Sequence, residues 1–213
     1  VLVIGAHFDS VEIGDGADDN ASGVGVLLEL AERLKDVKTN CTIRFIAFGA
    51  EEDGLLGSTF YMSNLKENEV KNIVHVINLD TLISGNKMYV YGDFGDKGVL
   101  REAALKAASE MNIPLITQQG TKEFPKGTTG PFSDHVPFTE KGIPYAYFEA
   151  TDWDLGAKDG YTQVEDKYGE KGEIWHSKYD TLEYINKTFP GRMEAHLNGF
   201  VRVIMKIVPD FKP

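Results

Sequence analysis

The sequence predicts an α/β fold, and two observations lead to that prediction. Short apolar runs typical of buried strands alternate with longer segments of helical periodicity along the 213 residues. This alternation of predicted strands and helices is typical of α/β proteins. Histidine and acidic residues also recur directly after the predicted strands.

The first half of the chain contains three predicted strands and two predicted helices. The apolar run Val1–Gly5 predicts a buried strand, and Ala21–Lys35 predicts a helix because its leucines recur every three or four residues. A second strand is expected at Thr42–Phe48. A helix at about Leu56–Leu65 and a strand at Ile73–Leu79 follow it.

The second half continues the pattern with shorter strands. Lys87–Tyr91 predicts a short strand, and Val99–Met111 predicts a helix. Two more strands are expected at Leu115–Thr117 and Tyr145–Phe148. The C-terminal segment Phe189–Val208 is predicted to form one long helix.

Composition and length indicate one globular domain over residues 1–213. Of the residues, 42% are hydrophobic and 26% are charged, which is ordinary for a globular domain with its own core. The sequence begins inside a strand pattern without an initiator Met, so we expect a fragment whose domain lacks its N-terminal part. Cys41 is the only cysteine, which excludes a disulfide within the chain and suggests a small core residue.

The charge of the chain restricts its partners. The formal net charge is −11 and the pI is about 4.9, which argues against nucleic acid or an anionic membrane as the main partner. No run of about 18 apolar residues is present to span a membrane. Part of the acidity is expected to belong to a metal site, because clustered carboxylates repel each other without a cation.

The polar residues after the strands predict a ligand site. His7 follows the first strand, the pair Glu51 and Glu52 follows the second, and Asp80 ends the third. Ligands of open α/β sheets bind at the C-terminal ends of the strands, so these residues are expected to converge. Asp19 lies in the turn before the first predicted helix, where helix capping by Asp18 or Asp19 is an alternative role.

Six sequence motifs in order resemble the co-catalytic zinc aminopeptidases, a family that includes secreted bacterial aminopeptidases and aminopeptidase Y. The motifs are His7-x-Asp9, Gly16–Gly23 with its Asp18-Asp19-Asn20 core, Ala50-Glu51-Glu52-x-Gly54-Leu55-x-Gly57-Ser58, Asn78-Leu79-Asp80, Ser133-Asp134-His135-x-Pro137-Phe138 and His176-Ser177-x-x-Asp180-Thr181. The resemblance implies a three-layer α/β/α fold around a mixed, mainly parallel sheet.

The resemblance also implies a di-zinc site. Asp19 would bridge two zinc ions, with His7 and Asp80 completing one site and Glu52 and His176 the other. Glu51 would be the general base of a reaction in which metal-activated water hydrolyses the N-terminal peptide bond. The implied substrates are peptides with a free N-terminus, and the implied location is secreted or extracytoplasmic.

Further residues are expected to support the ligands or to line the substrate pocket. Asp9 would orient His7, as carboxylates commonly do for zinc-bound imidazole. The same group contains Ser133, Asp134, His135 and Trp175. His75 and His196 are assigned to packing or to the surface, because they lie within an apolar strand and on the terminal helix.

The region before the last histidine departs from the family pattern. Several of these aminopeptidases have a tyrosine there that stabilises the oxyanion, whereas here Trp175 precedes His176. Its indole N–H could donate instead, and Tyr161, Tyr168 and Tyr179 remain open alternatives. The long segment 151–174 is expected either to shape the pocket for the first side chain or to form a solvated flap.

Two other functions are compatible with the same scaffold. The Trp-His pair also resembles the glutaminyl cyclases, which bind a single zinc and cyclise N-terminal glutamine. The resemblance extends as well to the transferrin receptor ectodomain, which lacks peptidase activity. The complete set of five ligands and Glu51 favours the aminopeptidase over both.

Overall fold

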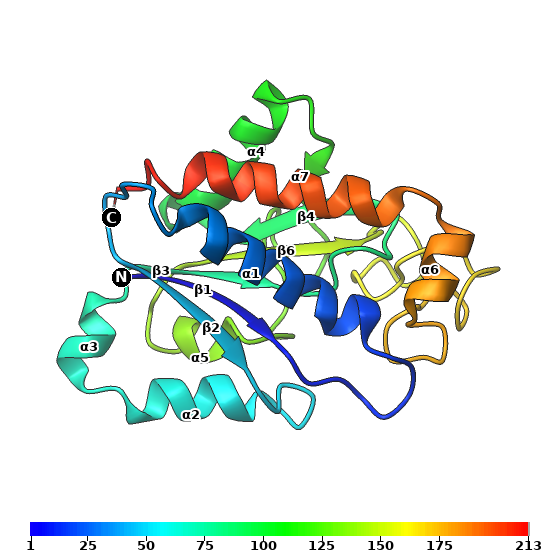
Figure 1. Ribbon diagram of the computed structural model, residues 1–213, viewed down its shortest axis with the longest axis horizontal. Helices are drawn as coiled ribbons and strands as arrows, with labels where there is room; N and C mark the ends of the chain where they lie inside the picture. The colour runs from blue at the N-terminus through cyan, green and yellow to red at the C-terminus, as the bar shows by residue number, and fades with distance from the viewer. Residues whose placement is uncertain (213) are drawn as a thin grey trace.

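The computed structural model describes residues 1–212 and contains one six-stranded mixed sheet (Figure 1). The strands are β1 (Leu2–His7), β2 (Ile43–Phe48), β3 (His75–Leu79), β4 (Lys87–Gly92), β5 (Leu115–Ile116) and β6 (Tyr145–Thr151). Their order is β2-β1-β3-β6-β4-β5. β2, β1, β3 and β6 are parallel, and β4 pairs antiparallel with β6 and parallel with β5. The expected mixed, mainly parallel sheet is therefore confirmed.

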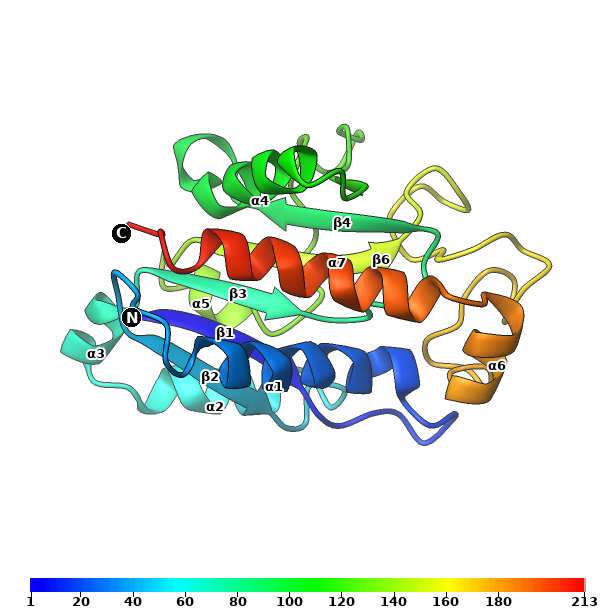
Figure 2. The same ribbon diagram turned by 45° about the horizontal axis from the view of Figure 1, so that its top comes forward.

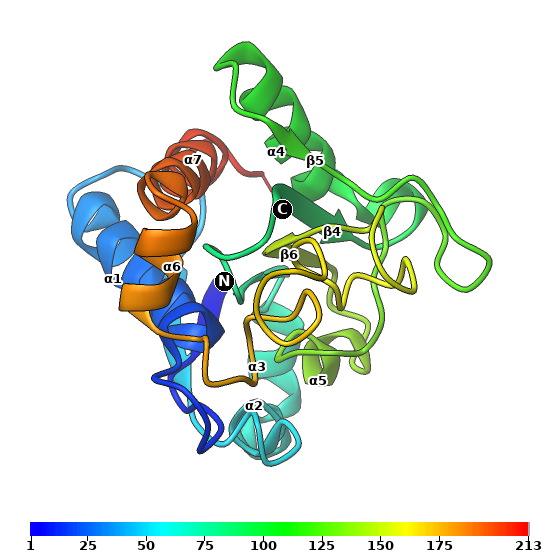
Figure 3. The same cartoon turned by 90° about the vertical axis from the view of Figure 1, so that its right-hand side faces the viewer.

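Helices cover both faces of this sheet (Figures 1 and 3). The described helices are α1 (Gly23–Leu34), α2 (Leu56–Asn64), α3 (Glu67–Asn72), α4 (Val99–Glu110), α5 (Val136–Thr139), α6 (Leu182–Thr188) and α7 (Arg192–Ile207). α1, α4 and α7 pack together on one face, whereas α2 and α5 pack on the other. No helix within residues 1–212 has the length and apolar character needed to cross a membrane.

Alternation along the strands divides the core into two clusters. In β1, Leu2 and Ile4 face the cluster under α1 and α7, and Val3 faces the aromatic cluster on the opposite side. In β6, Phe148 joins the first cluster and Tyr147 the second. Because every residue of β1 is buried, this central strand is covered on both faces, as parallel sheets require.

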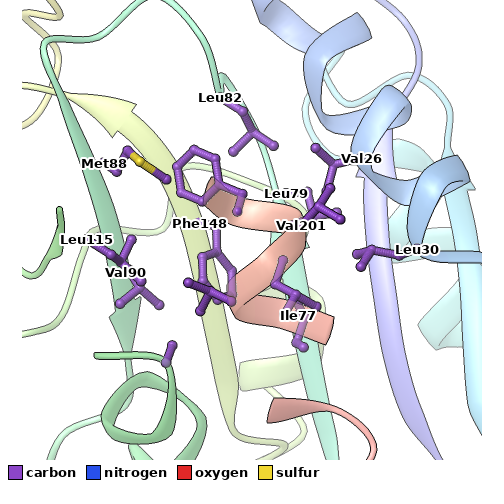
Figure 4. Close-up of a cluster of buried hydrophobic side chains, with 14 of the residues drawn as sticks. Val26, Leu30, Ile77, Leu79, Leu82, Met88, Val90, Leu115, Phe148 and Val201 are labelled. Atoms are coloured by element: carbon purple, nitrogen blue, oxygen red, sulfur yellow. The ribbon is translucent and has the colours of Figure 1, made fainter. Parts of the chain in front are cut away.

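The larger cluster is centred where α7 crosses the sheet. Figure 4 shows Val201 of α7 among Ile77, Leu79 and Phe148 of the strands, with Leu30 of α1 at the side. These side chains are 6% exposed or less. Burying one such side chain contributes about 1.5–3 kcal/mol, so this face fixes the sheet beneath α1 and α7.

The predicted C-terminal helix at 189–208 is confirmed as α7, although α7 begins only at Arg192 and ends at Ile207. The chain forms α6, capped by Thr181 through a hydrogen bond from the Tyr184 N–H, and a separate α7. Pro190 lacks a backbone donor, and Gly191 has φ of 79°, so the segment between the two helices cannot continue a right-handed helix.

Smaller differences concern element ends and short helices. α1 begins at Gly23 rather than Ala21, because residues 17–22 form an irregular turn with non-helical backbone angles at Asp19 and Asn20. α3, α5 and α6 were not predicted, and β6 extends three residues beyond the predicted end at Phe148. Cys41 is only partly buried, packed against the larger core cluster.

Candidate metal centre

Five side chains from separate parts of the chain converge at the C-terminal ends of β1 and β3. His7 ends β1, and Asp80 directly follows β3. Asp19 lies in the turn before α1, Glu52 lies after β2, and His176 lies in the long segment after β6. In Figures 1 and 2 this segment, coloured yellow to orange, lies at the end of the molecule toward which β1, β3 and β6 point.

Asp19 offers one carboxylate oxygen to each of two groups. Its Oδ1 lies 3.1 Å from His7 Nε2, and its Oδ2 lies 3.1 Å from His176 Nε2. Asp80 Oδ1 lies 3.2 Å from His7 Nε2, and Glu52 Oε2 lies 2.9 Å from His176 Nε2. Two three-residue clusters therefore share Asp19.

These spacings suit tetrahedral zinc. Zinc ligands lie about 2.0–2.2 Å from the ion, so neighbouring donor atoms of one tetrahedron are about 3.4 Å apart. The donor pairs measured here are 2.9–3.2 Å apart, only slightly closer. Buried Glu52 Oε1 has no hydrogen-bond partner among residues 1–212, although a buried carboxylate oxygen normally has one. The donor set and the unpaired oxygen both fit bound cations.

The carboxylates hold both imidazoles in their charged form. Burial opposes protonation of His7, but Asp80 and Asp19 outweigh it and raise the pKa of His7 to about 12. Hydrogen bonds to Asp19 and Glu52 raise the pKa of His176 to about 10. Zinc needs the neutral imidazole, so metal binding here must displace these protons.

Glu51 lies beside the clusters and differs from Glu52. Its carboxylate can reach His7 and Glu52, but it forms no hydrogen bond or ion pair within residues 1–212. Burial raises the pKa of Glu51 to about 9, and the nearby Asp80 carboxylate adds to the effect. Glu51 is thus a carboxylate placed to exchange protons next to the ligand clusters.

Asp9 was expected to orient His7 through its carboxylate, but its contacts are different. His7 Nδ1 bonds the backbone oxygen of Asp9 at 3.1 Å, whereas the Asp9 carboxylate is 3.7 Å away. That carboxylate instead accepts the backbone N–H groups of Glu51 and Glu52, each at 3.1 Å. Asp9 therefore orients His7 through its backbone and the two glutamates through its side chain.

The Ser-Asp-His motif lies behind Asp80. Ser133 Oγ donates to Asp80 Oδ2 at 2.7 Å and accepts from the Asn78 side chain at 2.8 Å. Asp134 is fully buried, and burial raises its pKa to about 7. His135 stacks on Tyr145 with 4.6 Å between ring centroids, and it neither joins the ligand clusters nor lines the cavity.

Two aspartates outside the expected ligand set, Asp18 and Asp180, hold the turn that carries Asp19. The Asp180 carboxylate accepts the backbone N–H groups of Asp18 and Asp19 at 2.6 and 3.1 Å. The Asp18 carboxylate accepts from Ile83, Ser84 and Gln163. Both aspartates stood in the quoted motifs, but only the folded chain shows their partners.

Asn20 and Gly23 fix the same turn to the end of β3. The Asn20 side chain donates to the Leu79 carbonyl at 2.9 Å and accepts from the Gly23 N–H at 3.0 Å. A Cβ at Gly23 would lie 2.5 Å from the Leu79 carbonyl oxygen, so only glycine permits this approach. Asn20, rather than Asp18 or Asp19, supplies the side-chain contact at the start of α1.

A cavity opens beside the ligands, and His7, Asp19 and Glu52 line it. Trp153, Asp159 and Tyr161 of the segment 151–174 line it, so part of this segment shapes the cavity. Its use for the first side chain of a substrate stays a prediction. Trp175 also lines the cavity, and its indole N–H has no partner among residues 1–212. Of the open tyrosine alternatives, only Tyr161 reaches the cavity.

Comparison with known proteins places the site in context. A family model described as peptidase family M28 matches residues 1–201. The alkaline phosphatase isozyme conversion protein of Escherichia coli (strain K12) is 40% identical over 202 residues, which cover 92% of this chain and 58% of that protein. Aminopeptidase YwaD of Bacillus subtilis (strain 168) is 36% identical over 192 residues, covering 88% and 37%.

A solved structure of a zinc aminopeptidase from Bacillus subtilis superposes with a TM-score of 0.74 at 33% identity. The match covers 99% of this chain and 47% of that one. The chain thus spans roughly half the length of the relatives it matches.

Proposed function

The chain belongs to peptidase family M28, and we propose that it is a zinc-dependent aminopeptidase that hydrolyses the N-terminal peptide bond of peptides. The observation that carries the proposal is the division of the Asp19 carboxylate between two imidazole clusters. A carboxylate shared in this way suits two cations a few ångströms apart, as in other two-metal hydrolases.

Each residue has a separate task in this proposal. His7, Asp19 and Asp80 would hold one zinc ion, and Asp19, Glu52 and His176 the other. Zinc bound there supplies a Lewis acid and lowers the pKa of water to roughly 7.

Glu51 would act as the general base. It would take a proton from the attacking water and pass the proton to the departing amine. Its freedom from the hydrogen bonds and ion pairs that engage Glu52 supports this role.

The negative charge that develops on the scissile carbonyl oxygen needs a donor. Trp175 is the candidate on this chain, because it lines the cavity and its indole N–H has no partner among residues 1–212. Its ring centroid lies 4.7 Å from that of His176. A preorganised donor of this kind contributes about 2.7–4 kcal/mol to the transition state.

Acidic side chains in the cavity also favour substrates that have a free, positively charged N-terminus. Asp80 and Glu51 line the cavity, where an ammonium group would offset their charge. A peptide nitrogen within a chain carries no such charge. This supports an exopeptidase rather than an endopeptidase.

The alternatives predict other metal contents. A glutaminyl cyclase would need one zinc ion, so the second complete ligand cluster would serve no purpose. A receptor-like ectodomain without peptidase activity would need neither of the two zinc ions. An extracytoplasmic location stays a prediction from the family resemblance.

The test combines zinc content with turnover. Elemental analysis of the dialysed protein should give two zinc ions per chain, and the protein should release the first residue from amino acid amides. One zinc with cyclisation of N-terminal glutamine would instead identify a cyclase.

Replacing Glu51 by Gln should lower kcat by at least about 10²- to 10⁴-fold with zinc content unchanged, because Glu51 moves protons and binds no metal. Loss of zinc in Glu51→Gln would show that Glu51 and Glu52 have exchanged roles. A matched control is Glu12→Gln, which changes an exposed glutamate outside the cavity and should preserve turnover.

A further inference from the structure

The cavity contains two acidic side chains that the proposed chemistry does not use. Glu149 projects from β6, and Asp159 lies in the segment after β6. Both line the cavity with the ligand residues, but neither belongs to the ligand clusters. They therefore have access to a bound substrate without a role in holding metal.

Glu149 is held in place by a short chain of hydrogen bonds. The Trp153 indole N–H donates to the Tyr91 hydroxyl at 2.6 Å, and this hydroxyl lies 2.7 Å from Glu149 Oε2. Because an indole can only donate, the Tyr91 proton points to Glu149. This contact fixes the direction of the carboxylate at the edge of the cavity.

Within residues 1–212 no basic side chain forms an ion pair with Glu149. No lysine or arginine of this part of the chain lines the cavity either. The nearby Lys87 pairs with Asp152 and Asp154 instead. Burial raises the pKa of Glu149 to about 8, as expected for a carboxylate removed from water without a counter-ion.

Aromatic rings form the walls next to these carboxylates. Tyr161 lies 5.3 Å from Trp175 and 5.2 Å from Phe132, measured between ring centroids. All three rings line the cavity. Aromatic faces attract ammonium and guanidinium groups, and arginine also stacks on them through its planar head.

We propose that this part of the cavity receives the basic side chain of an N-terminal arginine or lysine, with Glu149 as the residue that selects it. The inference rests on the proposed aminopeptidase function. The aromatic walls cover the aliphatic stem of the side chain, and Glu149 pairs with its charged head. Asp159 is half-buried at the same cavity and adds a weaker attraction.

The test compares two substrates that differ only in charge. Arginyl and citrullinyl 4-nitroanilides have nearly the same shape, but citrulline is neutral. The zinc-loaded protein should hydrolyse the arginyl substrate with at least about tenfold higher kcat/KM, because pairing one partly buried charge contributes 1.4 kcal/mol or more. In Glu149→Gln this ratio should fall about tenfold, and in Asp159→Asn it should fall less.

A matched control changes an acid of the same segment that lies outside the cavity. Asp166 is exposed and does not line the cavity, so Asp166→Asn alters the net charge equally and should leave the ratio unchanged. Free arginine and citrulline, titrated calorimetrically as reaction products, should show the same preference without turnover.

Three results would overturn the inference. They are no preference for arginine in the unmodified protein, an unchanged ratio in both variants, or a parallel loss for both substrates in Glu149→Gln. The last result would place Glu149 against the α-amino group or in a structural role. Absence of turnover on every amide by the zinc-loaded protein would instead refute the aminopeptidase proposal itself.

Discussion

Asp180→Asn should weaken zinc binding although Asp180 is not among the proposed ligands. Its carboxylate is 2% exposed and accepts the backbone N–H groups of Asp18 and Asp19 at 2.6 and 3.1 Å. Asparagine has one acceptor oxygen, so one of these N–H groups would face an NH2 group. An unsatisfied buried donor costs about 1–3 kcal/mol, which the turn can relieve by moving Asp19.

The expected consequence is a loss in affinity at both metal sites, because Asp19 is common to both. Groups that hold a metal ligand in position typically contribute a factor of about 10 to 100 in metal affinity. The assay is a zinc titration in competition with a chromophoric chelator, together with urea unfolding of the zinc-free protein. The unfolding free energy should fall by about 1–3 kcal/mol.

Thr181→Ala is the matched control for this effect. Thr181 is the next residue and caps α6 through the Tyr184 N–H at 3.1 Å, but it makes no hydrogen bond to Asp18 or Asp19. Its loss should cost about 1 kcal/mol of stability without changing zinc affinity. Zinc affinity within twofold of the unmodified protein in Asp180→Asn, or an equal loss in Thr181→Ala, would refute the reasoning.

Two further predictions concern Asp19 and His196. Asp19→Ala should empty both zinc sites, and full zinc content in that variant would exclude a bridging role. Burial, aided by Arg192, lowers the pKa of His196 to about 4, so the unfolded chain binds the proton more readily below pH 6.5. Between pH 7.5 and 5 the unmodified protein should therefore lose about 2 kcal/mol more unfolding free energy than His196→Gln. Urea unfolding at the two pH values measures this difference, and equal losses would contradict the shift.

Much of the sheet and of the ligand cluster follows from local sequence patterns. Apolar runs located the strands, and a parallel sheet collects the residues after its strands at one edge. The convergence of His7, Asp80 and Glu52 therefore needs little beyond strand assignment. The direction of β4 could not be predicted in this way, because nothing within Lys87–Gly92 distinguishes antiparallel pairing with β6 from parallel pairing.

The features that sequence patterns missed depend on contacts between distant residues. Asp180 and Asp18 are 162 positions apart, so their hydrogen bond leaves no trace in periodicity. Glu149 was overlooked because β6 was predicted to end at Phe148, whereas the strand continues and turns Glu149 toward the cavity. The break before α7 was different, since Pro190-Gly191 stands in the sequence and its effect on a helix is local.

The proposed metal ligands and the aromatic walls of the cavity are held in place differently, so substrate specificity can change without loss of the metal ligands. Ala50, Thr81 and His176 all have positive φ of 50–55°, and each is, or adjoins, a ligand or Glu51. Such backbone angles in non-glycine residues cost about 1–3 kcal/mol each, and they persist only where the surroundings enforce them. Here the enforcing contacts include those of Asp9 to the glutamates and of Asn20 to the end of β3.

The aromatic residues Phe132 and Tyr161 of the cavity wall have no such positive φ. Phe132 and Tyr161 are each 39% exposed and lie in connections outside the strands and helices. Substitutions there change the cavity without disturbing the turn that holds Asp19. Glu149 is the exception, because β6 fixes its backbone while its side chain faces the substrate side of the cavity. A change of charge at Glu149 is therefore expected to alter substrate preference from within the sheet itself.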